Sequence, residues 1–538
     1  MSCSQELIGV LLSGIASHAL FNRYEPSVLL FLALIASGSS ASLIWTLKDD
    51  ISFNGLIKST VLTARFGATF ITGLATSLAL YRLSPWHPLA VYPGPPLAKL
   101  SKWWMAYWVA KGQRHVKIRE LHAKYGPWVR IGPNEISVNV PAAIRPIYSN
   151  MFRSPFYQGA PMDADALVTT NDRHEHSLRV VAWNKAFNAD SQRQYRSLAQ
   201  SRTSQLLSIL SQASDGNQKV NLSLWISLWS MDIMGDMSFS GGFETMAAGK
   251  DSEGWMEILA QGTLAVGILG QVPWMRDIVA LLPQPGPIIT FQQFAKKKVL
   301  ETRSSSKSGV PKDILGIIQN ESTYPISSAE AAADASFMVV AGQDTISQAL
   351  TGFFRYVTAD VQILSRLREE LDTTFDYAIE DMDPFILGKL PFLDACVQET
   401  LRMLPPVAAG PPRYSGKEEM RVLNKVIPPG TTVACPIYTL HHDKDNFYDP
   451  DRFIPERWLS NSNKVHNVEA FIPFSSGVGI CVGKPVALHN MKLLASSIIH
   501  KFDLSFADGF DASKFDSSYK EHNLWVHDPL FLSIRRRV

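Results

Sequence analysis

The sequence predicts a mainly α-helical protein with small β-sheets, preceded by an N-terminal membrane anchor. Apolar stretches dominate residues 1–91, and the chain after them carries long runs with helix start and stop signals. Short runs at residues 128–131 and 135–138 predict strands that interrupt these helices. Because no second linker or repeat follows, we expect one large domain over residues 101–538.

The apolar stretches cover residues 7–21, 28–45 and 66–83. Each is about as long as the roughly 17 to 25 residues that a bilayer needs, or slightly shorter. We expect two or three transmembrane helices, and the alternative is that part of this region is a soluble pair of buried helices. A cleaved signal peptide explains the first stretch less well, because no basic residue precedes it.

Basic residues follow the last apolar stretch, at Arg82, Lys99 and Lys102. By the positive-inside rule they place the remainder of the chain in the cytosol, and we expect the anchor to lie in the endoplasmic reticulum membrane. Between anchor and domain stands Tyr92-Pro-Gly-Pro-Pro96. Proline fixes φ and lacks an N–H, so residues 92–100 are expected to form a stiff hinge.

The overall composition excludes some classes of protein. The chain has 51 basic and 49 acidic residues, a net charge of +2, which provides no field for holding nucleic acid. Its four cysteines are far apart, without the spacing of a zinc site or a disulfide framework: Cys3, Cys396, Cys435 and Cys481. We therefore expect reduced thiols in a domain that faces the cytosol.

One short segment, Phe474 to Lys484, packs three glycines around a single cysteine: FSSGVGICVGK. A phosphate-binding loop does not fit, because Val478 stands where the first Walker glycine is required and Val482 where the dinucleotide fingerprint needs its third glycine. A redox pair does not fit either, since no second cysteine lies nearby. The remaining possibility is a metal ion bound by a single thiolate. Haem provides such a site, because four porphyrin nitrogens and one axial cysteine bind its iron.

The composition of the loop suits that chemistry. Glycines let the backbone approach a flat macrocycle and direct amide groups at the sulfur, which stabilises a thiolate. Residues 485–502 predict a helix that begins just after the loop, with Pro485 allowed in its first turn. The positive end of its dipole also favours an anionic sulfur.

Phe474, Gly477, Cys481 and Gly483 match the pattern FxxGxRxCxG. The segment resembles the haem-binding loop of the haem-thiolate monooxygenases, the cytochrome P-450 superfamily. The resemblance implies the fold of that superfamily and haem b with Cys481 as axial ligand of the iron. The sequence departs from the pattern at Gly479, where the family has an arginine that pairs with a haem propionate.

Two further motifs agree with the resemblance. Glu399 and Arg402 lie three residues apart in a predicted helix, so both side chains share one face; alone, this spacing also suits an ordinary surface salt bridge. The family's ExxR motif has this form, and Arg457 supplies the arginine that completes it. The resemblance implies that the three residues form a buried structural network.

The second motif lies in a long predicted helix over residues 327–359, opened by a Ser327-x-x-Glu330 capping box. Ala341 and Gly342 near its middle are small, and Asp344 and Thr345 follow them. This resembles the family's oxygen-activating motif, in which the small residues lie at the haem and make room for O2 and substrate. The resemblance implies that Thr345 hydrogen-bonds a bound oxygen and that Asp344 relays protons. The alternative is a helix kink with a threonine bonded to its own backbone.

A third segment contains basic groups at His176 and Arg179. A zinc site is one interpretation of its two histidines and two arginines, and a solvated start of a helix is another. By resemblance, His176, Arg179 and Arg413 are candidates for holding the haem propionates in the absence of an arginine at position 479. The segment lacks the tryptophan that the family commonly has at the position of His176.

Taken together, the motifs imply a membrane-anchored monooxygenase that oxidises a lipophilic small molecule with O2. No nicotinamide or flavin motif occurs, so a separate NADPH-cytochrome reductase is the expected electron donor. The N-terminal spans resemble those of fungal members that act in secondary metabolite biosynthesis. Two alternatives stay open: an isomerase or dehydratase of the same fold that uses a hydroperoxide, and a haem protein without enzymatic activity.

Overall fold

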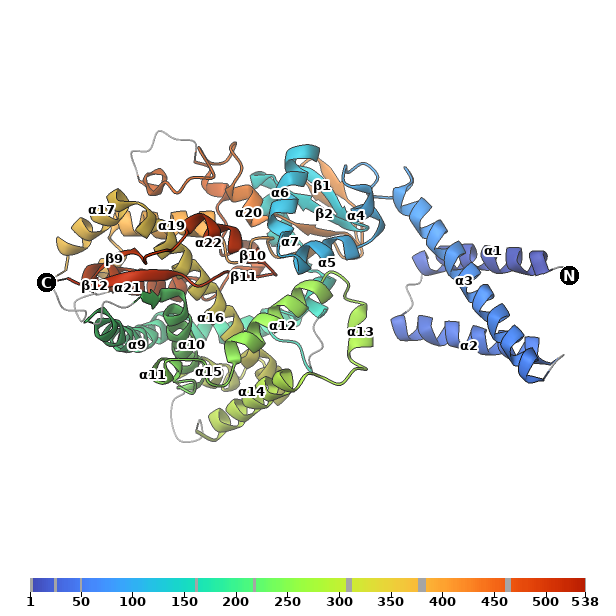
Figure 1. Ribbon diagram of the computed structural model, residues 1–538, viewed down its shortest axis with the longest axis horizontal. Helices are drawn as coiled ribbons and strands as arrows, with labels where there is room; N and C mark the ends of the chain where they lie inside the picture. Colours follow the sequence, from blue (N-terminus) through green and yellow to red (C-terminus); the bar gives the residue numbers. More distant parts are fainter. Residues whose placement is uncertain are drawn as a thin grey trace.

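The computed structural model of the protein describes residues 3–23, 27–48, 51–159, 163–215, 219–305, 312–375, 384–459 and 466–537. The fold is mainly helical with small sheets, which confirms the predicted fold class. Figure 1 shows the N-terminal helices projecting from one end of a broad body that contains the remaining elements. The predicted divisions at residues 91 and 100 stay predictions.

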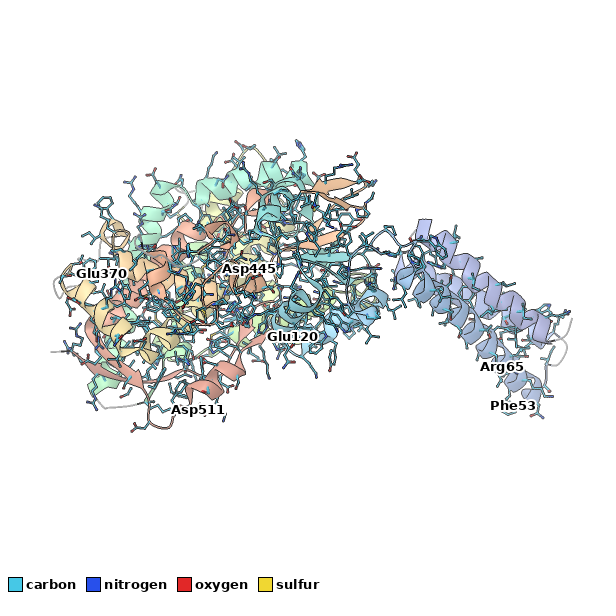
Figure 2. The ribbon with its side chains drawn as sticks, turned by 90° about the horizontal axis from the view of Figure 1, so that it is seen from above. Phe53, Arg65, Glu120, Glu370, Asp445 and Asp511 are labelled. Atoms are coloured by element: carbon cyan, nitrogen blue, oxygen red, sulfur yellow. The ribbon has the colours of Figure 1, made fainter. Side chains whose placement is uncertain are left out.

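Three helices form the N-terminal region: α1 (Cys3–Arg23), α2 (Val28–Leu47) and α3 (Phe53–Leu83). By length and composition, α2 and α3 qualify as membrane-crossing helices. The crossing of α1 and α3 is close, because a Cβ atom at Gly73 would collide with the backbone carbonyl of Leu11. Figure 2 shows the three helices extending away from the body, with Phe53 and Arg65 toward the far end. These helices are compatible with the predicted anchor.

The proline-rich segment is held against the body. The buried Tyr92 hydroxyl donates to the Val426 carbonyl at 2.8 Å, and the Arg130 amide donates to the Pro93 carbonyl at 2.7 Å. Gly94 lies so close to the backbone of Arg130 that a Cβ atom would not fit. The expected stiffness of this segment is thus reinforced by contacts with the first strand of the body.

The predicted long helix and the predicted helix after the cysteine loop are both confirmed, as α16 (Ser328–Ala359) and α21 (Lys484–Lys501). The helices of the body have the following bounds: α4 (Pro96–Leu100), α5 (Trp103–Ala110), α6 (Arg114–Tyr125), α7 (Pro141–Asn150), α8 (Arg173–Ala186), α9 (Ala189–Asp215), α10 (Leu222–Phe239), α11 (Thr245–Ala248), α12 (Trp255–Leu269), α13 (Met275–Val279), α14 (Gly286–Ser305), α15 (Ile314–Gln319), α16 (Ser328–Ala359), α17 (Val361–Asp372), α18 (Pro384–Leu387), α19 (Pro391–Met403), α20 (Ile437–His441), α21 (Lys484–Lys501) and α22 (Ala512–Ser518). Short 3-10 turns include η1 (Pro155–Gln158), η4 (Pro455–Trp458), η5 (Val468–Ala470) and η6 (Gly477–Gly479).

The largest sheet has five strands in the order β1-β2-β8-β5-β3. Both predicted strands belong to it, as β1 (Trp128–Gly132) and β2 (Glu135–Val138), with β3 (Phe152–Arg153), β5 (Arg413–Tyr414) and β8 (Thr432–Ala434). A three-stranded sheet joins β4 (Lys219–Asn221), β12 (Phe531–Arg536) and β9 (Phe502–Phe506). The remaining strands pair two by two: β6 (Met420–Val422) with β7 (Lys425–Ile427), and β10 (Lys520–Glu521) with β11 (Trp525–Val526).

Helix α16 is the central element of the body. Its capping box is present as predicted, with the Ser327 hydroxyl accepting from the Glu330 amide and the Glu330 carboxylate accepting from the Ser327 amide. The helix is largely buried and packs against α10, α14 and α21. Figure 1 shows it crossing the body, so residues near its middle lie deep in the molecule.

Candidate active site

The cysteine loop runs through η6 into α21, between the main helical core and α7. The Cys481 amide donates to the Phe474 carbonyl at 3.0 Å, which closes the loop on itself. Gly477 has φ of +67°, and a Cβ atom there would strike the Tyr148 carbonyl at the end of α7. A glycine is therefore required at position 477 both for backbone conformation and for close packing.

Cys481 is exposed, whereas Cys396 and Cys435 are buried. Partial removal of water raises the pKa of the Cys481 thiol, while the amides of Gly483 and Lys484 and the charge of Lys484 act in the opposite direction. These are the amide contacts expected of a loop that stabilises a thiolate. The loop thus presents one accessible sulfur surrounded by hydrogen-bond donors.

Arg413 in β5 reaches the loop at Gly479. Its guanidinium occupies the space that a Cβ atom at Gly479 would need. The side chain is only 4% exposed, lies 5.1 Å from the centre of the Tyr148 ring, and its Nε has no hydrogen-bond partner among the described residues. An arginine is therefore present beside position 479, although it comes from another part of the chain.

Two further basic side chains lie with Arg413. Arg153 in β3 is paired directly with Arg413 across the sheet, and His176 in α8 packs edge to face on Phe152 at 5.5 Å. Burial, together with the charges of Arg153 and Arg413, lowers the pKa of His176 to about 4. Burial also lowers the pKa of Arg153 to about 10, although Tyr157 opposes this, and the charge of Arg413 lowers it further. We call Arg153, His176 and Arg413 the basic cluster.

The basic cluster fits the carboxylate edge of a haem. No ion pair formed by the described residues includes Arg153 or Arg413, and the charge of Asp165 acts on Arg153 only from beyond ion-pair distance. A buried cation without a partner is costly, and a bound carboxylate removes that cost with charge-assisted hydrogen bonds. Since an exposed thiol lies on the neighbouring loop, the donor set agrees with haem.

Arg179 differs from the other predicted basic residues, because protein carboxylates already engage it. Its Nη2 donates to Asp334 of α16 at 3.0 Å, and its Nη1 donates to Glu175 at 3.0 Å. Only its buried Nε lacks a partner among the described residues. The structure thus joins Arg179 to α16, and its predicted contact with a propionate stays a prediction with little support from this geometry.

Asp344 and Thr345 lie near the middle of α16, both half-buried. Burial raises the pKa of the Asp344 carboxyl to about 7, so this group exchanges a proton near neutral pH. The Thr345 hydroxyl donates to the Ala341 carbonyl at 2.6 Å. The hydroxyl oxygen still has lone pairs with which to accept a hydrogen bond, so the backbone contact leaves it able to take part in the predicted chemistry.

Gly342 has a packing role in addition to the predicted one. A Cβ atom there would collide with the Met234 side chain of α10, and the Ser230 hydroxyl of the same helix donates to the Gln343 carbonyl at 2.9 Å. The glycine therefore lets α10 and α16 approach closely. Ala341, directly before it, is half-buried.

Glu399 accepts hydrogen bonds from both predicted arginines. Arg402 donates through Nε and Nη2 at 2.9 and 2.8 Å, and Arg457 donates through Nε at 3.1 Å. The Ile454 amide and the Trp458 indole add two more donors at 2.8 and 2.9 Å. Burial acts to raise the pKa of Glu399, but the two arginines and the amide outweigh it and hold the pKa below its usual range.

The guanidinium groups of this network are fully buried, and their other N–H groups donate to backbone carbonyls of His441, Tyr448, Asp449, Pro450 and Arg452. The network therefore fixes the segment after α20 against α19. Sequence reasoning missed Trp458, whose position beside Arg457 offered no signal that its indole would join the network.

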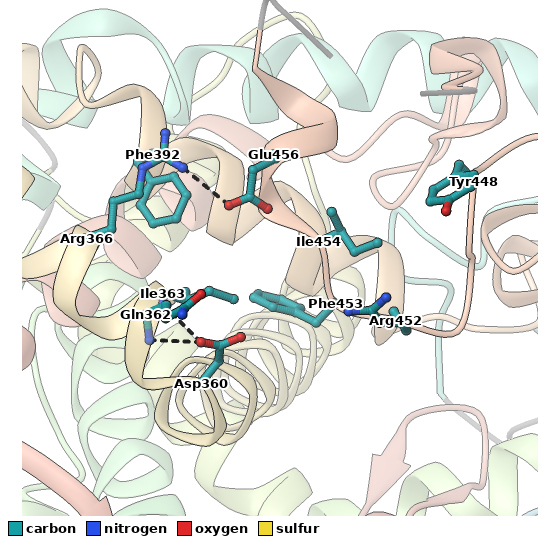
Figure 3. Close-up of a pocket in the computed structure, with 10 residues that line it drawn as sticks. All are labelled: Asp360, Gln362, Ile363, Arg366, Phe392, Tyr448, Arg452, Phe453, Ile454 and Glu456. Carbon is teal, nitrogen blue, oxygen red and sulfur yellow. Dashed lines mark hydrogen bonds and ion pairs between the residues drawn. The ribbon is translucent and has the colours of Figure 1, made fainter. Parts of the chain in front are cut away.

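A hollow of about 390 Å³ borders this network, and Figure 3 shows the ten residues that line it. Arg366 pairs with Glu456 at 3.3 Å and lies over the Phe392 ring, while the Asp360 carboxylate caps α17. Most charged side chains of this hollow thus already have interaction partners within the protein, unlike the arginines of the basic cluster.

Comparisons with known proteins agree with this site. Residues 93–524 match the family model described as cytochrome P-450. A cytochrome P-450 monooxygenase of Fusarium pseudograminearum is 30% identical over 92% of this chain and 91% of its own length. A cytochrome P-450 of Uromyces fabae is 30% identical over 97% of both chains, and tryprostatin B 6-hydroxylase of Aspergillus fumigatus is 30% identical over 85% of this chain and 82% of its own.

Proposed function

The chain belongs to the cytochrome P-450 family, and from this premise we propose that it oxidises a lipophilic small molecule in fungal secondary metabolism. It is a monooxygenase that uses haem with an axial cysteine thiolate. We assign Cys481 as that ligand, since it is the exposed cysteine in the loop that carries the family pattern. Haem bound there supplies the iron at which O2 is activated.

The chain's own contribution to oxygen chemistry lies in α16. With a pKa of about 7, Asp344 holds a proton at neutral pH and releases it without a large energetic cost. Thr345 is one residue further on, and its hydroxyl oxygen can accept a hydrogen bond while donating to Ala341. We assign proton delivery to this pair, and this role disfavours a hydroperoxide isomerase, which needs no proton relay.

The basic cluster would hold the carboxylate edge of the haem. The sequence already predicted this role for Arg413 and His176. Arg153 is a third basic side chain for it, because it pairs with Arg413 across the sheet. The single observation that carries the proposal is the combination of this cluster, which forms no ion pair with the described residues, with an exposed Cys481 on the adjoining loop.

The substrate is proposed by analogy. The name of one relative gives hydroxylation of tryprostatin B as its reaction, so we propose that this chain also hydroxylates an organic small molecule. We further propose that α2 and α3 lie in the endoplasmic reticulum membrane, where lipophilic substrates and an NADPH-cytochrome reductase are accessible, with the body on the cytosolic side.

A difference spectrum of the reduced, carbon-monoxide-bound protein tests the assignment. We expect full-length protein in native membranes to show the red-shifted Soret band of a thiolate-bound haem. Cys481→Ala should lose this band, whereas Cys396→Ala should keep it because Cys396 is buried in α19. A retained band in Cys481→Ala would mean that another residue binds the iron.

A further inference from the structure

Helices α1 and α3 pack against each other and run in the same direction. Gly14 of α1 lies against the backbone of Phe70 in α3, where a Cβ atom would collide with the Phe70 carbonyl. One turn further along α1, the His18 ring forms a hydrogen bond with the Ser77 hydroxyl at 2.8 Å. Because the contacts advance along both helices together, the amino ends of α1 and α3 lie at the same end of the pair.

Helix α2 supplies the return path between these two parallel helices. It begins at Val28, shortly after α1 ends at Arg23, and it runs in the opposite direction. The Ser42 hydroxyl, near the end of α2, forms a hydrogen bond with the Thr63 hydroxyl, in the first part of α3, at 3.2 Å. Figure 1 shows α1 and α3 both leading toward the body, with α2 leading away from it.

The apolar stretches of α1 and α3 lie at one depth. Residues 11–18 of α1 contact residues 70–81 of α3, so the stretch 7–21 lies beside the stretch 66–83. Helix α3 is long and apolar enough to cross a membrane. Helix α1 has 21 residues. At ~1.5 Å per residue it spans about 31 Å, close to the ~30 Å hydrocarbon core of a bilayer. A membrane that surrounds α3 at this depth therefore also surrounds α1.

The outer surface of α1 suits contact with lipid. Ile8, Leu12 and Ile15 share one face of the helix and are 57%, 57% and 42% exposed. His18 is turned inward instead, with 8% of its surface exposed, and its hydrogen bond with Ser77 lies between the helices. Lipid tails offer no hydrogen-bond partner, so this orientation keeps a polar ring away from them.

We propose that α1 is a third membrane-crossing helix, so that its amino end and the body lie on opposite sides of the membrane. The inference rests on the proposed placement of α2 and α3 in the endoplasmic reticulum membrane. An odd number of crossings separates the two sides, and with a cytosolic body the amino end of α1 lies in the lumen. The charges agree, because Glu6 stands in the first turn of α1 and Arg23 at its end nearer the body.

The test uses the full-length chain in sealed microsomes, with a flexible tag that contains one Asn-Gly-Thr sequon. The tag is added before the first residue in one version and after the last residue in a matched version. N-glycans are attached only on the lumenal side, and each version is assayed for a gel shift that an N-glycosidase removes. Added protease then reports which tags are accessible from the cytosolic side, and detergent opens the vesicles as a control.

We expect the amino-terminal tag to carry a glycan and to lose its signal to protease only after detergent is added. The carboxyl-terminal tag should carry no glycan and should lose its signal in sealed vesicles. The body's own sequons at Asn221 and Asn320 should likewise remain unmodified. Digestion of both tags in sealed vesicles would overturn the proposal, because two crossings would then place both ends in the cytosol.

The carboxyl-terminal tag separates this inference from the proposed function. Its protection in sealed vesicles would contradict the cytosolic placement of the body, whatever the position of the other tag. Protection of both tags would contradict the third crossing as well. Digestion of the amino-terminal tag with protection of the carboxyl-terminal tag would support three crossings in the reverse orientation.

Discussion

The guanidinium of Arg413 fills the space in which a side chain at Gly479 would begin. The family's loop arginine is absent from this chain, and an arginine from strand β5 stands in its place. The glycine is what permits this arrangement, because any Cβ atom at position 479 would displace Arg413.

This relationship predicts an unusual outcome for restoring the family residue. Gly479→Arg should lower haem retention, because the new side chain collides with Arg413 and places two like charges together. The double variant Gly479→Arg with Arg413→Ala should retain more haem than either single variant, since one arginine then occupies the site. Haem content per protein and the thermal unfolding midpoint are the measurements. Wild-type haem retention in Gly479→Arg would show that the two positions do not compete.

The Glu399 network predicts a contrast between a buried and an exposed carboxylate. Glu399→Gln leaves Arg402 and Arg457 buried without their anion and should cost about 3–5 kcal/mol of unfolding free energy. Glu456→Gln is the control, because its pair with Arg366 is nearly half exposed and should contribute less than about 1 kcal/mol. Denaturant unfolding of the haem-loaded protein measures both. A loss below about 1 kcal/mol for Glu399→Gln would contradict the structural role of the network.

Asp344 predicts a pH dependence of product formation. Its pKa of about 7 means that the carboxyl carries a proton below neutral pH and loses it above. The fraction of NADPH electrons that reach product should therefore fall as pH rises past about 7. Asp344→Asn should show low coupling without this pH dependence, while Asp445→Asn, an exposed carboxylate elsewhere, should behave as the wild type. An unchanged profile in Asp344→Asn would exclude it as the proton donor.

The same pKa also affects stability. Because the folded state binds a proton that the unfolded chain releases between its ordinary pKa of 3.8 and about 7, unfolding free energy should decrease as pH rises through this window. Asp344→Asn removes the titrating carboxyl and with it this pH-dependent loss of unfolding free energy. The variant should therefore be more stable than the wild type at pH 8 and similar at low pH. Thermal unfolding midpoints across the window check the sign.

The crossing of α1 and α3 predicts different effects for two glycines of one helix. Gly73→Ile should separate the helices, because its side chain meets the Leu11 carbonyl, whereas Gly67 has no atom within 4 Å of a Cβ position. Limited proteolysis of the full chain in detergent micelles should therefore release α1 faster in Gly73→Ile than in the wild type. Gly67→Ile should match the wild type, and faster release in both variants would mean that added bulk, not this contact, loosens the helix.

Several features follow from short stretches of sequence because their causes are local. The capping box of α16 and the three-residue spacing of Glu399 and Arg402 depend on neighbours along the chain. Periodicity and proline placement also predicted β1, β2 and the helix after the loop. These predictions required no knowledge of which distant segments meet.

Other features could not be predicted in this way. Arg153 enters the basic cluster only because β3 pairs with β5, and a two-residue strand leaves almost no periodic signal. Arg179 has the same local appearance as a propionate-binding residue, yet the packing of α8 against α16 places Asp334 at its guanidinium. Gly342 is explained as much by Met234 of α10 as by the chemistry of its own helix.

The sequence by itself thus determined the class of fold, the family, the cysteine that we propose as the iron ligand and the motif on α16, because each is encoded by residue type at short spacing. The tertiary structure decided which basic side chains converge beside that cysteine and which of them remain free of carboxylates. The physical reason is that the charge of a buried arginine is compensated only where a carboxylate lies next to it. That carboxylate can come from a distant part of the chain, so the sequence around the arginine does not reveal it.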